Sequence, residues 1–557
     1  MEEHIQKRIF MTALAALAVI LMVCVYGDSE VKGEEPRQGT AYFIQGNACP
    51  GMTLKVGSLD GFGMSEPKYT WRVGEEILPH TDASYTPVEA DLEKMISVTI
   101  AADGYEDQIL YAYCSRLPVL YLNMEGMEDE DFQEQYKSAA YVLQGTDDAD
   151  GAVYLEGSAQ VKGRGNSSSL YPKKAFKLKL DKKEDLLGMG EHKHWVLISN
   201  YAEHSLMRNT LAVWFAKQMG ADAMDTKWVS LVLNGKYYGN YQLSEQVRPG
   251  LSRVPVTDYD QIADSVAEVC INQKMISPVK QDFLRDVLKN DLGWLSKGYF
   301  IFEGKPYQIP MGVEIPVLTG GFILEIDSNF DNASKFMTET QQPVMFTSPD
   351  SANTNQELME FAQEYVQAIE DAVCAEDHSA VYQGETVHYS DLIDMDSLVK
   401  YWLINELFYN VDFGVNSMFF YKDIEGKAYM GPIWDLDWSS NARWGAEPTE
   451  GWLSRSKYTR FTWFKELIKD PYFIREVQKS YWKYRPVLQE MTRDDGTIDQ
   501  YYMYLRESAM ANERLWPKER GFEEDVYQFL KPWMKERLAW IDEQMQTPET
   551  LAISLNQ

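Results

Sequence analysis

Short runs of alternating hydrophobic and polar residues fill the chain between residues 41 and 115. These runs are TLKV, YTWRV, SYTPV, MISVTI and ILYAYC, and turn-forming residues separate them. Short strands that recur at this spacing are typical of a small β-sandwich. We therefore expect an all-β unit over residues 41–116.

The pattern changes at Pro118, where a longer unit begins. LPVLYLN, YLEGSAQVKGRG and AFKLKL predict strands, and residues 204–219 predict a helix. WVSLVLNGKYYGNYQLSEQV predicts a β-hairpin that turns at Asn234-Gly235. After about residue 355 the pattern becomes mostly helical, ending with a helix near 524–545. A strand-rich half followed by a helical half predicts a two-lobed α+β domain over residues 117–546, with a short tail at 547–557.

The N-terminus carries an export signal. Lys7 and Arg8 precede an apolar run from Ile9 to about Tyr26, the arrangement of a signal peptide that is cleaved after Gly27. The run is also just long enough for an uncleaved membrane anchor, so residues 1–27 have two interpretations. Residues 28–40 are polar and predict a linker. Under either interpretation the rest of the chain is secreted or extracellular, with membrane anchoring if the segment is retained.

Composition excludes some classes of function. Hydrophobic residues make up 45% of the 557 residues, enough for sizeable cores, so wholesale disorder is excluded. The net charge of −32 repels a phosphate backbone, so we expect no nucleic-acid partner. Cys49 and Cys114 bracket the β-unit, and either a disulfide or two free thiols is compatible with this spacing.

Acidic side chains gather in the segment from Asn405 to Asn441. A predicted helix leads into a loop with Asp412 and Asn416, and a predicted hairpin then ends at Asp435. A hairpin brings its two ends together, so we expect these three side chains to lie close. Two carboxylates and an amide are oxygen ligands suited to Mg²⁺ or Mn²⁺ with substrate phosphates. The alternative is that these acids only cap turns.

Cationic side chains gather between Lys162 and Leu180. Small residues in GRGNSSS predict a turn that exposes backbone N–H groups to phosphates, and four lysines follow it. Alternation in AFKLKL places Lys177 and Lys179 on one strand face and apolar residues on the other. A solvent-exposed strand face is the alternative. Together, cations in the strand-rich half and metal-binding acids in the helical half suit phosphoryl transfer.

Five segments in order resemble the CotH family, the spore-coat protein H-like atypical kinases. They are RGNSSSLYPKKAFKLKL, LLGMGEHKHWVLISNYAEHSLMRN, LNGKYYGNYQLSEQV, NELFYNVDFGVNSMFFYKD and GPIWDLDWS. The resemblance covers roughly residues 118–545 and implies a two-lobed fold similar to that of protein kinases. Separately, Trp71 and the SYTPVEADLEKMISVTI segment resemble bacterial immunoglobulin-like modules.

The CotH resemblance implies roles for the acidic segment. Asp412 corresponds to the acid that orients or deprotonates the attacking hydroxyl. Asp435 corresponds to the metal-binding acid, and Asn416 to the amide that helps to hold metal. Asn416 lies one position closer to the acid than in the protein-kinase catalytic loop, a departure that weakens its assignment.

The resemblance also implies nucleotide-binding residues. Arg164 and either Lys173 or Lys174 correspond to phosphate-binding cations, while Glu245 and Gln246 lie where a nucleotide-contacting hinge is expected. Arg208 falls on the helix that corresponds to the regulatory helix of kinases. No glutamate there is placed to pair with the lysine, so that ion pair is not carried over.

These observations predict an exported, Mg²⁺- or Mn²⁺-dependent kinase that transfers a phosphoryl group from ATP to Ser or Thr of a protein. Because ATP is scarce outside cells, the alternative is a non-catalytic adhesion or assembly module with the same fold. Binding of a cell-surface polymer such as a polysaccharide is a third hypothesis. An adhesion module has no need for Asp412 and Asp435 beside a cationic strand, so the retained acids favour the enzyme.

Overall fold

The computed structural model describes residues 42–58, 63–129, 131–146, 152–165, 167–442 and 447–556. The expected signal segment (1–27) and linker (28–40) lie outside these described residues. Within the described part of the chain, no helix combines the length and the apolar character needed to cross a bilayer.

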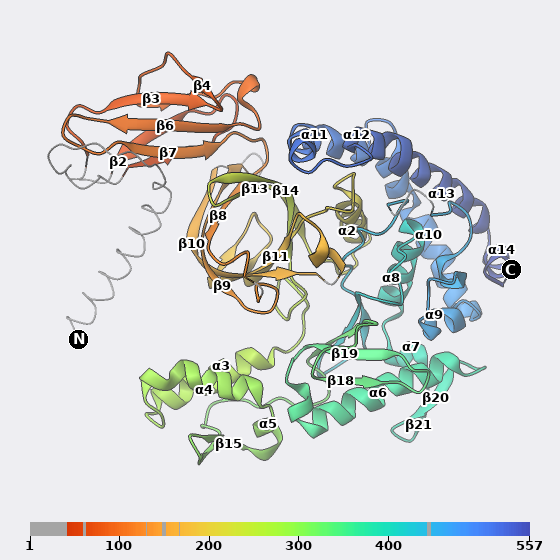
Figure 1. Cartoon of the computed structure of the whole chain (residues 1–557). Helices are drawn as coiled ribbons and strands as arrows, with labels where there is room; N and C mark the ends of the chain where they lie inside the picture. Colours follow the sequence, from red (N-terminus) through yellow and green to blue (C-terminus); the bar gives the residue numbers. More distant parts are fainter. Residues whose placement is uncertain are drawn as a thin grey trace. The chain divides into compact units, whose positions relative to one another are not determined.

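The chain contains groups of strands and groups of helices, which confirms the α+β class (Figure 1). The chain divides into two compact units. The first unit contains the described residues up to Tyr201, with Thr226–Ser244 and Tyr502–Phe522. The second unit contains Ala202–Asp225, Glu245–Tyr501 and the residues from Glu523 onward.

The first unit opens with two small antiparallel sheets that share one core. One sheet has the order β1-β2-β5 and the other β4-β3-β6-β7. Their bounds are β1 Tyr42–Gln45, β2 Leu54–Ser58, β3 Lys68–Val73, β4 Glu76–Ile77, β5 Ser84–Tyr85, β6 Met95–Ala101 and β7 Gln108–Tyr113. Trp71 is fully buried in the shared core, and its indole N–H donates to the Asp82 carbonyl at 2.9 Å. The expected strands are therefore present, while immunoglobulin-like identity stays a prediction. Cys49 and Cys114 are free thiols.

Seven further strands of the first unit close into a barrel in the order β10-β11-β12-β14-β13-β8-β9. Their bounds are β8 Val119–Met124, β9 Lys137–Thr146, β10 Ala152–Arg164, β11 Ala175–Asp185, β12 Glu191–Ile198, β13 Thr226–Leu233 and β14 Lys236–Glu245. β8 runs parallel to β13, with Val119 opposite Ser230. The β13–β14 turn falls at Asn234-Gly235, as expected, and both residues have positive φ (50° and 75°), as a two-residue hairpin turn requires.

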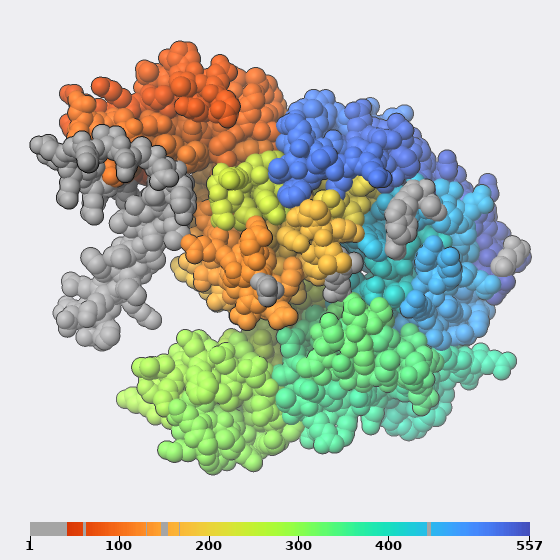
Figure 2. Space-filling view, in the orientation of Figure 1, coloured from red at the N-terminus to blue at the C-terminus, as the bar shows by residue number. Residues whose placement is uncertain are grey.

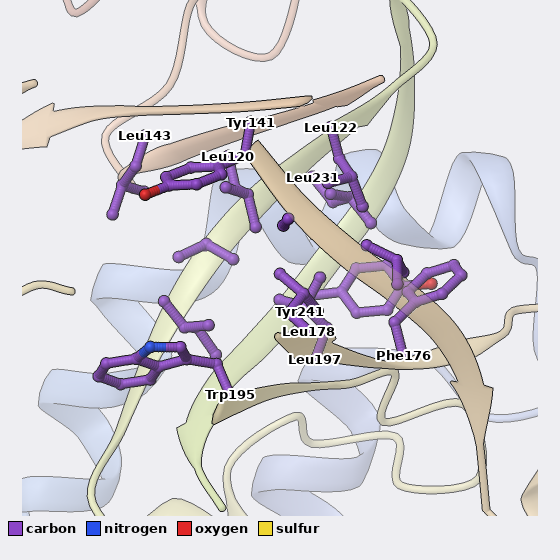
Figure 3. Packing of buried hydrophobic residues seen from close by; sticks show 14 of the residues in the cluster. Leu120, Leu122, Tyr141, Leu143, Phe176, Leu178, Trp195, Leu197, Leu231 and Tyr241 are labelled. Atoms are coloured by element: carbon purple, nitrogen blue, oxygen red, sulfur yellow. The ribbon is translucent and has the colours of Figure 1, made fainter. Parts of the chain in front are cut away.

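Alternation along β11 fills the interior of the barrel. Phe176, Leu178 and Leu180 are buried, whereas Lys179 is exposed, so the predicted facing of AFKLKL is confirmed. The inward side chains of the other strands complete the core shown in Figure 3, which includes Leu120, Leu122, Tyr141, Leu143, Trp195, Leu197, Leu231 and Tyr241.

The second unit is mostly helical around one five-stranded sheet of order β18-β19-β17-β22-β23. The strands are β17 Phe322–Ile326, β18 Lys335–Met337, β19 Pro343–Ser348, β22 Met418–Lys422 and β23 Tyr429–Met430. The main helices are α2 Arg208–Gln218, α6 Gln356–Cys374, α8 Met395–Phe408, α9 Thr462–Leu467, α10 Pro471–Thr492, α13 Lys531–Gln544 and α14 Pro548–Asn556. α11 (Thr497–Leu515) begins in the second unit and continues into the first.

The elements between Tyr259 and Gln308 form a group of their own, light green in Figures 1 and 2. It comprises α3 Tyr259–Asn272, α4 Gln281–Asn290, α5 Trp294–Lys297 and the hairpin β15 Tyr299–Phe302 with β16 Lys305–Gln308. A capping carboxylate starts α3, because Asp258 accepts from the Asp260 and Gln261 N–H groups.

The two small sheets join the barrel through Glu93. Its carboxylate accepts from the Tyr113 hydroxyl (3.1 Å) and the Ser115 hydroxyl (3.0 Å), and Ser115 also bonds to the Ser230 hydroxyl of β13 at 3.1 Å. Burial raises the pKa of Glu93 to about 7, although the two hydroxyl donors oppose that shift.

The barrel core predicts a contrast between two leucines of the first unit. Leu178→Ala should lower the free energy of unfolding by about 2–5 kcal/mol, because it leaves a cavity in a closed core. Leu170→Ala should change it by less than about 0.5 kcal/mol, because Leu170 is 84% exposed. Chemical denaturation measures both. Equal effects of the two substitutions would contradict the barrel packing.

Glu93 predicts a pH dependence of stability. Its folded pKa of about 7 lies above the ordinary 4.5, so the folded protein holds an extra proton between these pH values. The contribution of Glu93 is full below about pH 4.5 and declines as the pH rises to 7. Glu93→Gln cannot lose a proton, so it should match the parent at pH 4.5 and exceed it in stability at pH 8. Thermal denaturation across this range checks the prediction, and parallel curves for the two proteins would exclude it.

Candidate functional site

The loop with Asp412 leaves the end of a buried helix. α8 begins at the N-cap Asp394, whose carboxylate accepts from the Ser397 N–H at 2.8 Å. The helix is apolar on most sides and almost wholly buried, as expected of a helix inside a large core. It ends at Tyr409, whose φ of 50° turns the chain into the loop.

Two asparagine side chains support the Asp412 loop through hydrogen bonds. Asn405 donates to the Tyr401 carbonyl (2.9 Å), and its side-chain oxygen accepts from the Asn410 amide (2.9 Å). The Asn410 oxygen in turn accepts from the Asp412 N–H at 3.3 Å. Both asparagines are buried, so the series of bonds fixes the backbone at Asp412 relative to α8. No pattern in the sequence pointed to these two residues.

Asn416 faces Asp412 across the loop. The Asp412 carbonyl accepts from the Asn416 N–H at 3.0 Å, and the Asn416 side-chain NH₂ lies 3.5 Å from Asp412 Oδ1. The Asn416 side-chain oxygen accepts from Ser328, from its hydroxyl at 2.6 Å and its N–H at 3.3 Å. The structure therefore brings Asn416 and Asp412 together, as the sequence predicted, and turns the amide oxygen toward Ser328.

Asp435 follows the expected hairpin. β22 pairs antiparallel with β23, with Tyr421 opposite Tyr429. Asp435 is half-buried and has a φ of 63°, a left-handed conformation that is uncommon outside glycine.

Two main-chain bonds tie the Asp412 loop to the Asp435 segment. The Val411 N–H donates to the Trp438 carbonyl at 3.3 Å. The Ser440 N–H donates to the Phe408 carbonyl, at the end of α8, at 2.7 Å. The two acidic segments therefore lie against each other within the second unit, although 22 residues separate the acids in the sequence.

A buried ion pair supports the end of α8. The Glu406 carboxylate accepts from the N–H groups of Leu453 and Ser454 (2.7 Å each) and lies 3.5 Å from the Arg537 guanidinium. Arg537 also donates to the Glu406 carbonyl at 2.9 Å. Burial raises the pKa of Glu406 and lowers that of Arg537 to about 10, and each partner opposes the shift of the other. Nothing in the sequence around either residue signals this pairing.

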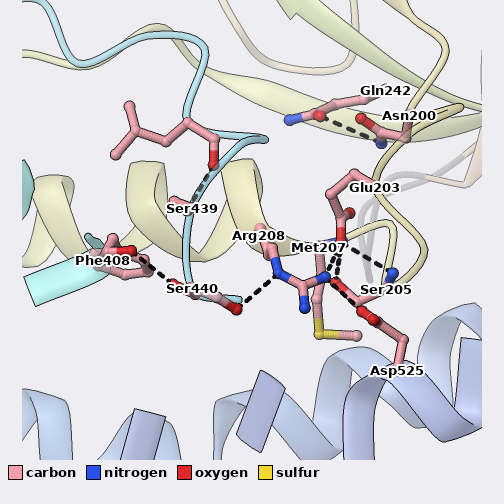
Figure 4. Close-up of polar contacts among 11 residues, drawn as sticks. Asn200, Glu203, Ser205, Met207, Arg208, Gln242, Phe408, Ser439, Ser440 and Asp525 are labelled. Carbon is pink, nitrogen blue, oxygen red and sulfur yellow. Dashed lines mark hydrogen bonds and ion pairs between the residues drawn. The ribbon is translucent and has the colours of Figure 1, made fainter. Parts of the chain in front are cut away.

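Arg208, at the start of α2, lies in a second buried ionic cluster (Figure 4). Its guanidinium contacts the carboxylates of Glu203 and Asp525, and all three side chains are about 1% exposed or less. Its Nε donates to the Ser440 carbonyl at 3.1 Å. Burial alone would lower the pKa of Arg208, but the two carboxylates outweigh it and raise that pKa above its ordinary value. The regulatory-helix role inferred for Arg208 stays a prediction.

The lysines of the first unit have different environments. Lys173 is 1% exposed, and its ammonium donates to the carbonyls of Ser199 (2.7 Å) and Asn240 (2.5 Å) and to the Asn512 side chain (2.9 Å). Three bonds use all of its donors, and burial, followed by the Lys518 charge, lowers its pKa well below 10.5. Lys173 thus holds the barrel to α11 in this structure.

Lys174 lies beside the glycine-rich turn. It is partly buried and donates to the Ser169 carbonyl at 2.8 Å. Arg164 is the last residue of β10, directly before Gly165, whose φ is 100°. Of the two lysines left open by the sequence, Lys174 is the one that lies beside this turn.

Glu245, the last residue of β14, and Gln246 directly after it belong to the second unit. Glu245 is 2% exposed, pairs with the Arg253 guanidinium at 2.6 Å and accepts from the Asp225 N–H at 2.6 Å. Burial raises the pKa of Glu245 to about 7, against the opposing charge of Arg253. Its carboxylate therefore stabilises the local chain, and the nucleotide contact expected of Glu245 and Gln246 stays a prediction.

The acids at this site suit a metal that arrives with phosphates. Over the described ranges, no three His, Cys, Asp or Glu side chains converge in a metal-binding group. Mg²⁺ bound with a nucleotide needs only one or two protein carboxylates, because phosphate and water oxygens complete its shell. Asp435 meets this requirement. The Asn416 amide oxygen could add a further ligand only if it exchanges Ser328 for the metal.

These features belong to an α+β protein with two acidic loops fastened together at the end of a buried helix. Residues 161–541 match the family described as CotH kinase protein, which is more than half of the chain. The chain therefore belongs to the CotH family, and the resemblance seen in the sequence is confirmed. A search of curated proteins gives no significant match. The domain boundaries expected at residues 116 and 546 stay predictions.

The amide series below Asp412 predicts the effect of an isosteric change. Asn410→Asp replaces the NH₂ that donates to Asn405 with a carboxylate oxygen, so two acceptors face each other in a buried site. We expect a loss of about 1–3 kcal/mol in the free energy of unfolding, measured by chemical denaturation. Asn353→Asp, at an exposed position of the same unit, is the control and should be neutral. An equally neutral Asn410→Asp would show that the series does not hold the loop.

Proposed function

We propose that this protein is a metal-dependent kinase that transfers a phosphoryl group from ATP to a Ser or Thr hydroxyl of a protein substrate. The observation that carries the proposal is the pair of main-chain bonds between the Asp412 loop and the segment of Asp435. An acid that activates a hydroxyl and an acid that holds a metal must act on the same phosphoryl group. Membership of the CotH family supports the same reaction.

Asp412 has the role of general base. Its carboxylate accepts the proton of the attacking hydroxyl as the hydroxyl oxygen bonds to the γ-phosphorus. The bond from the γ-phosphorus to the bridging oxygen of ADP breaks, and ADP leaves. The Asp412 N–H donates to the Asn410 side-chain oxygen, and the Asn416 side-chain NH₂ lies near the Asp412 carboxylate. These two contacts hold Asp412 in position before substrate binds.

Asp435, with Asn416 where its oxygen is released from Ser328, would hold Mg²⁺ or Mn²⁺. The bound ion supplies positive charge that neutralises the phosphates. Arg164 and Lys174 are the proposed phosphate-binding cations, whereas the saturated ammonium of Lys173 is proposed to be structural. Export and a surface-exposed protein substrate remain part of the proposal.

Calorimetry of the purified chain with ATP and Mn²⁺ tests the metal site. Parent protein should bind ATP in the presence of Mn²⁺, and Asp435→Ala should weaken this binding at least tenfold because it removes the metal carboxylate. Asp412→Asn should retain binding but lower the rate of phosphoryl transfer by about 10²–10⁴-fold.

Asp396→Ala is the control for these variants. Asp396 is an acid on α8 that is 70% exposed and pairs with Lys400 at 2.6 Å, so its loss should leave both binding and transfer unchanged. If the parent binds no nucleotide at millimolar ATP with Mn²⁺, the kinase proposal fails, and an adhesion or assembly module becomes the leading hypothesis.

A further inference from the structure

The start of α2 makes direct contact with the chain just after Asp435. The Asn209 side-chain oxygen accepts from the Leu436 N–H at 3.0 Å, and both residues are buried. Leu436 directly follows the residue in the left-handed conformation, so this bond fixes one side of the Asp435 peptide.

The loop that follows α2 fixes the other side. The Ile433 N–H donates to the Asp222 carbonyl at 2.8 Å, and the Ile433 carbonyl accepts from the Met224 N–H at 3.2 Å. Ala223 and Ile433 form a short parallel bridge there. The start of α2 and the loop that follows the helix therefore hold the segment on either side of Asp435.

Arg208 extends this contact to the Asp412 loop. Its Nε donates to the Ser440 carbonyl, while the Ser440 N–H donates to the Phe408 carbonyl at the end of α8 (Figure 4). The Ser440 hydroxyl also donates to Phe408, at 3.2 Å. Ser440 thus joins α2 to the end of α8, the helix that leads into the loop with the proposed base.

Two carboxylates fix the guanidinium that makes this contact. Glu203 precedes α2, and Asp525 begins a π-helical turn, Asp525–Leu530, that leads into α13. A buried guanidinium cannot rotate away from two buried carboxylates without leaving charges unpaired. The direction in which Arg208 Nε points is therefore set by residues on both sides of it.

We propose that Arg208 and Asn209 are positioning residues for phosphoryl transfer, which hold the Asp435 segment and the end of α8 in the arrangement that the reaction needs. This inference rests on the proposed kinase function and deepens it. Neither side chain contacts the acids themselves, so both act through the backbone of Leu436 and Ser440.

Hydrogen exchange tests the contact without any ligand. In Asn209→Ala the Leu436 amide loses its acceptor, so a peptide that covers residues 433–440 should exchange at least tenfold faster than in the parent. Asn355→Ala is the matched control, because the Asn355 side chain is buried in the same unit and accepts from the Leu358 N–H at 3.0 Å. The control should speed exchange at Leu358 and leave residues 433–440 unchanged.

Mn²⁺–ATP binding and transfer kinetics test the functional consequence. Asn209→Ala should weaken Mn²⁺–ATP binding or lower kcat by tenfold or more, with the KM for the protein substrate within about twofold of the parent. Asn355→Ala should lower thermal stability by a similar amount with kinetics unchanged. If Asn209→Ala exchanges faster at 433–440 but binds and turns over like the parent, the positioning role is wrong.

Arg208→Lys provides a second variant that keeps the buried charge. A lysine ammonium lacks the planar, fixed array of donors of a guanidinium, so it cannot bond to Glu203, Asp525 and the Ser440 carbonyl together. We therefore expect kcat to fall at least tenfold in a folded protein. Parental kcat in Arg208→Lys would overturn the part of the inference that concerns Arg208. Failure of the parent itself to bind Mn²⁺–ATP would instead refute the proposed function. The hydrogen-exchange result would still report on the contact between Asn209 and Leu436.

Discussion

The burial of the Arg208 guanidinium is a constraint on which the arrangement of the acidic segments in the second unit depends. A charge at 0% exposure is stable only with opposite charge and with acceptors for its N–H groups. Glu203 and Asp525 supply the charge, and the Ser440 carbonyl supplies an acceptor. Because Asp525 lies 317 positions after Arg208 in the sequence, the cluster can form only when the last part of the chain has folded against α2. The acidic segments therefore depend on a contact whose members lie far from them in the sequence.

The two units stabilise their buried cationic side chains in different ways. Arg208 keeps its charge between two carboxylates, which raise its pKa. Lys173 has no carboxylate within hydrogen-bonding distance among its partners, only two carbonyls and an amide oxygen, and its pKa falls well below the ordinary value. Neutral acceptors satisfy an ammonium without stabilising its charge as strongly as a carboxylate would. Such an arrangement suits a fixed structural contact between the barrel and α11 better than exchange with a phosphate.

Local patterns in the sequence were sufficient to predict the strands and the order of the acidic residues along the chain. Alternation in β11 and the Asn234-Gly235 turn predicted facing and pairing because side-chain period and turn chemistry act over a few residues. The hairpin placed the Asp412 and Asp435 segments together for the same reason. The sequence could not tell which of Lys173 and Lys174 is buried, because both precede the same strand. It also gave no sign of the Arg208 cluster, whose partners are remote and whose residue types are common on surfaces.

The left-handed backbone conformation of Asp435 depends on the hydrogen bonds on either side of it. A non-glycine residue in the left-handed region costs of order 1 kcal/mol or more and persists only where neighbouring contacts impose it. Here Ile433 is bonded to the loop after α2, and Leu436 is bonded to Asn209. Because Ile433 and Leu436 are both fixed, Trp434 and Asp435 between them have little freedom to relax toward an ordinary backbone. A carboxylate held in this way pays its ordering cost during folding, so a metal that binds there does not have to order it again.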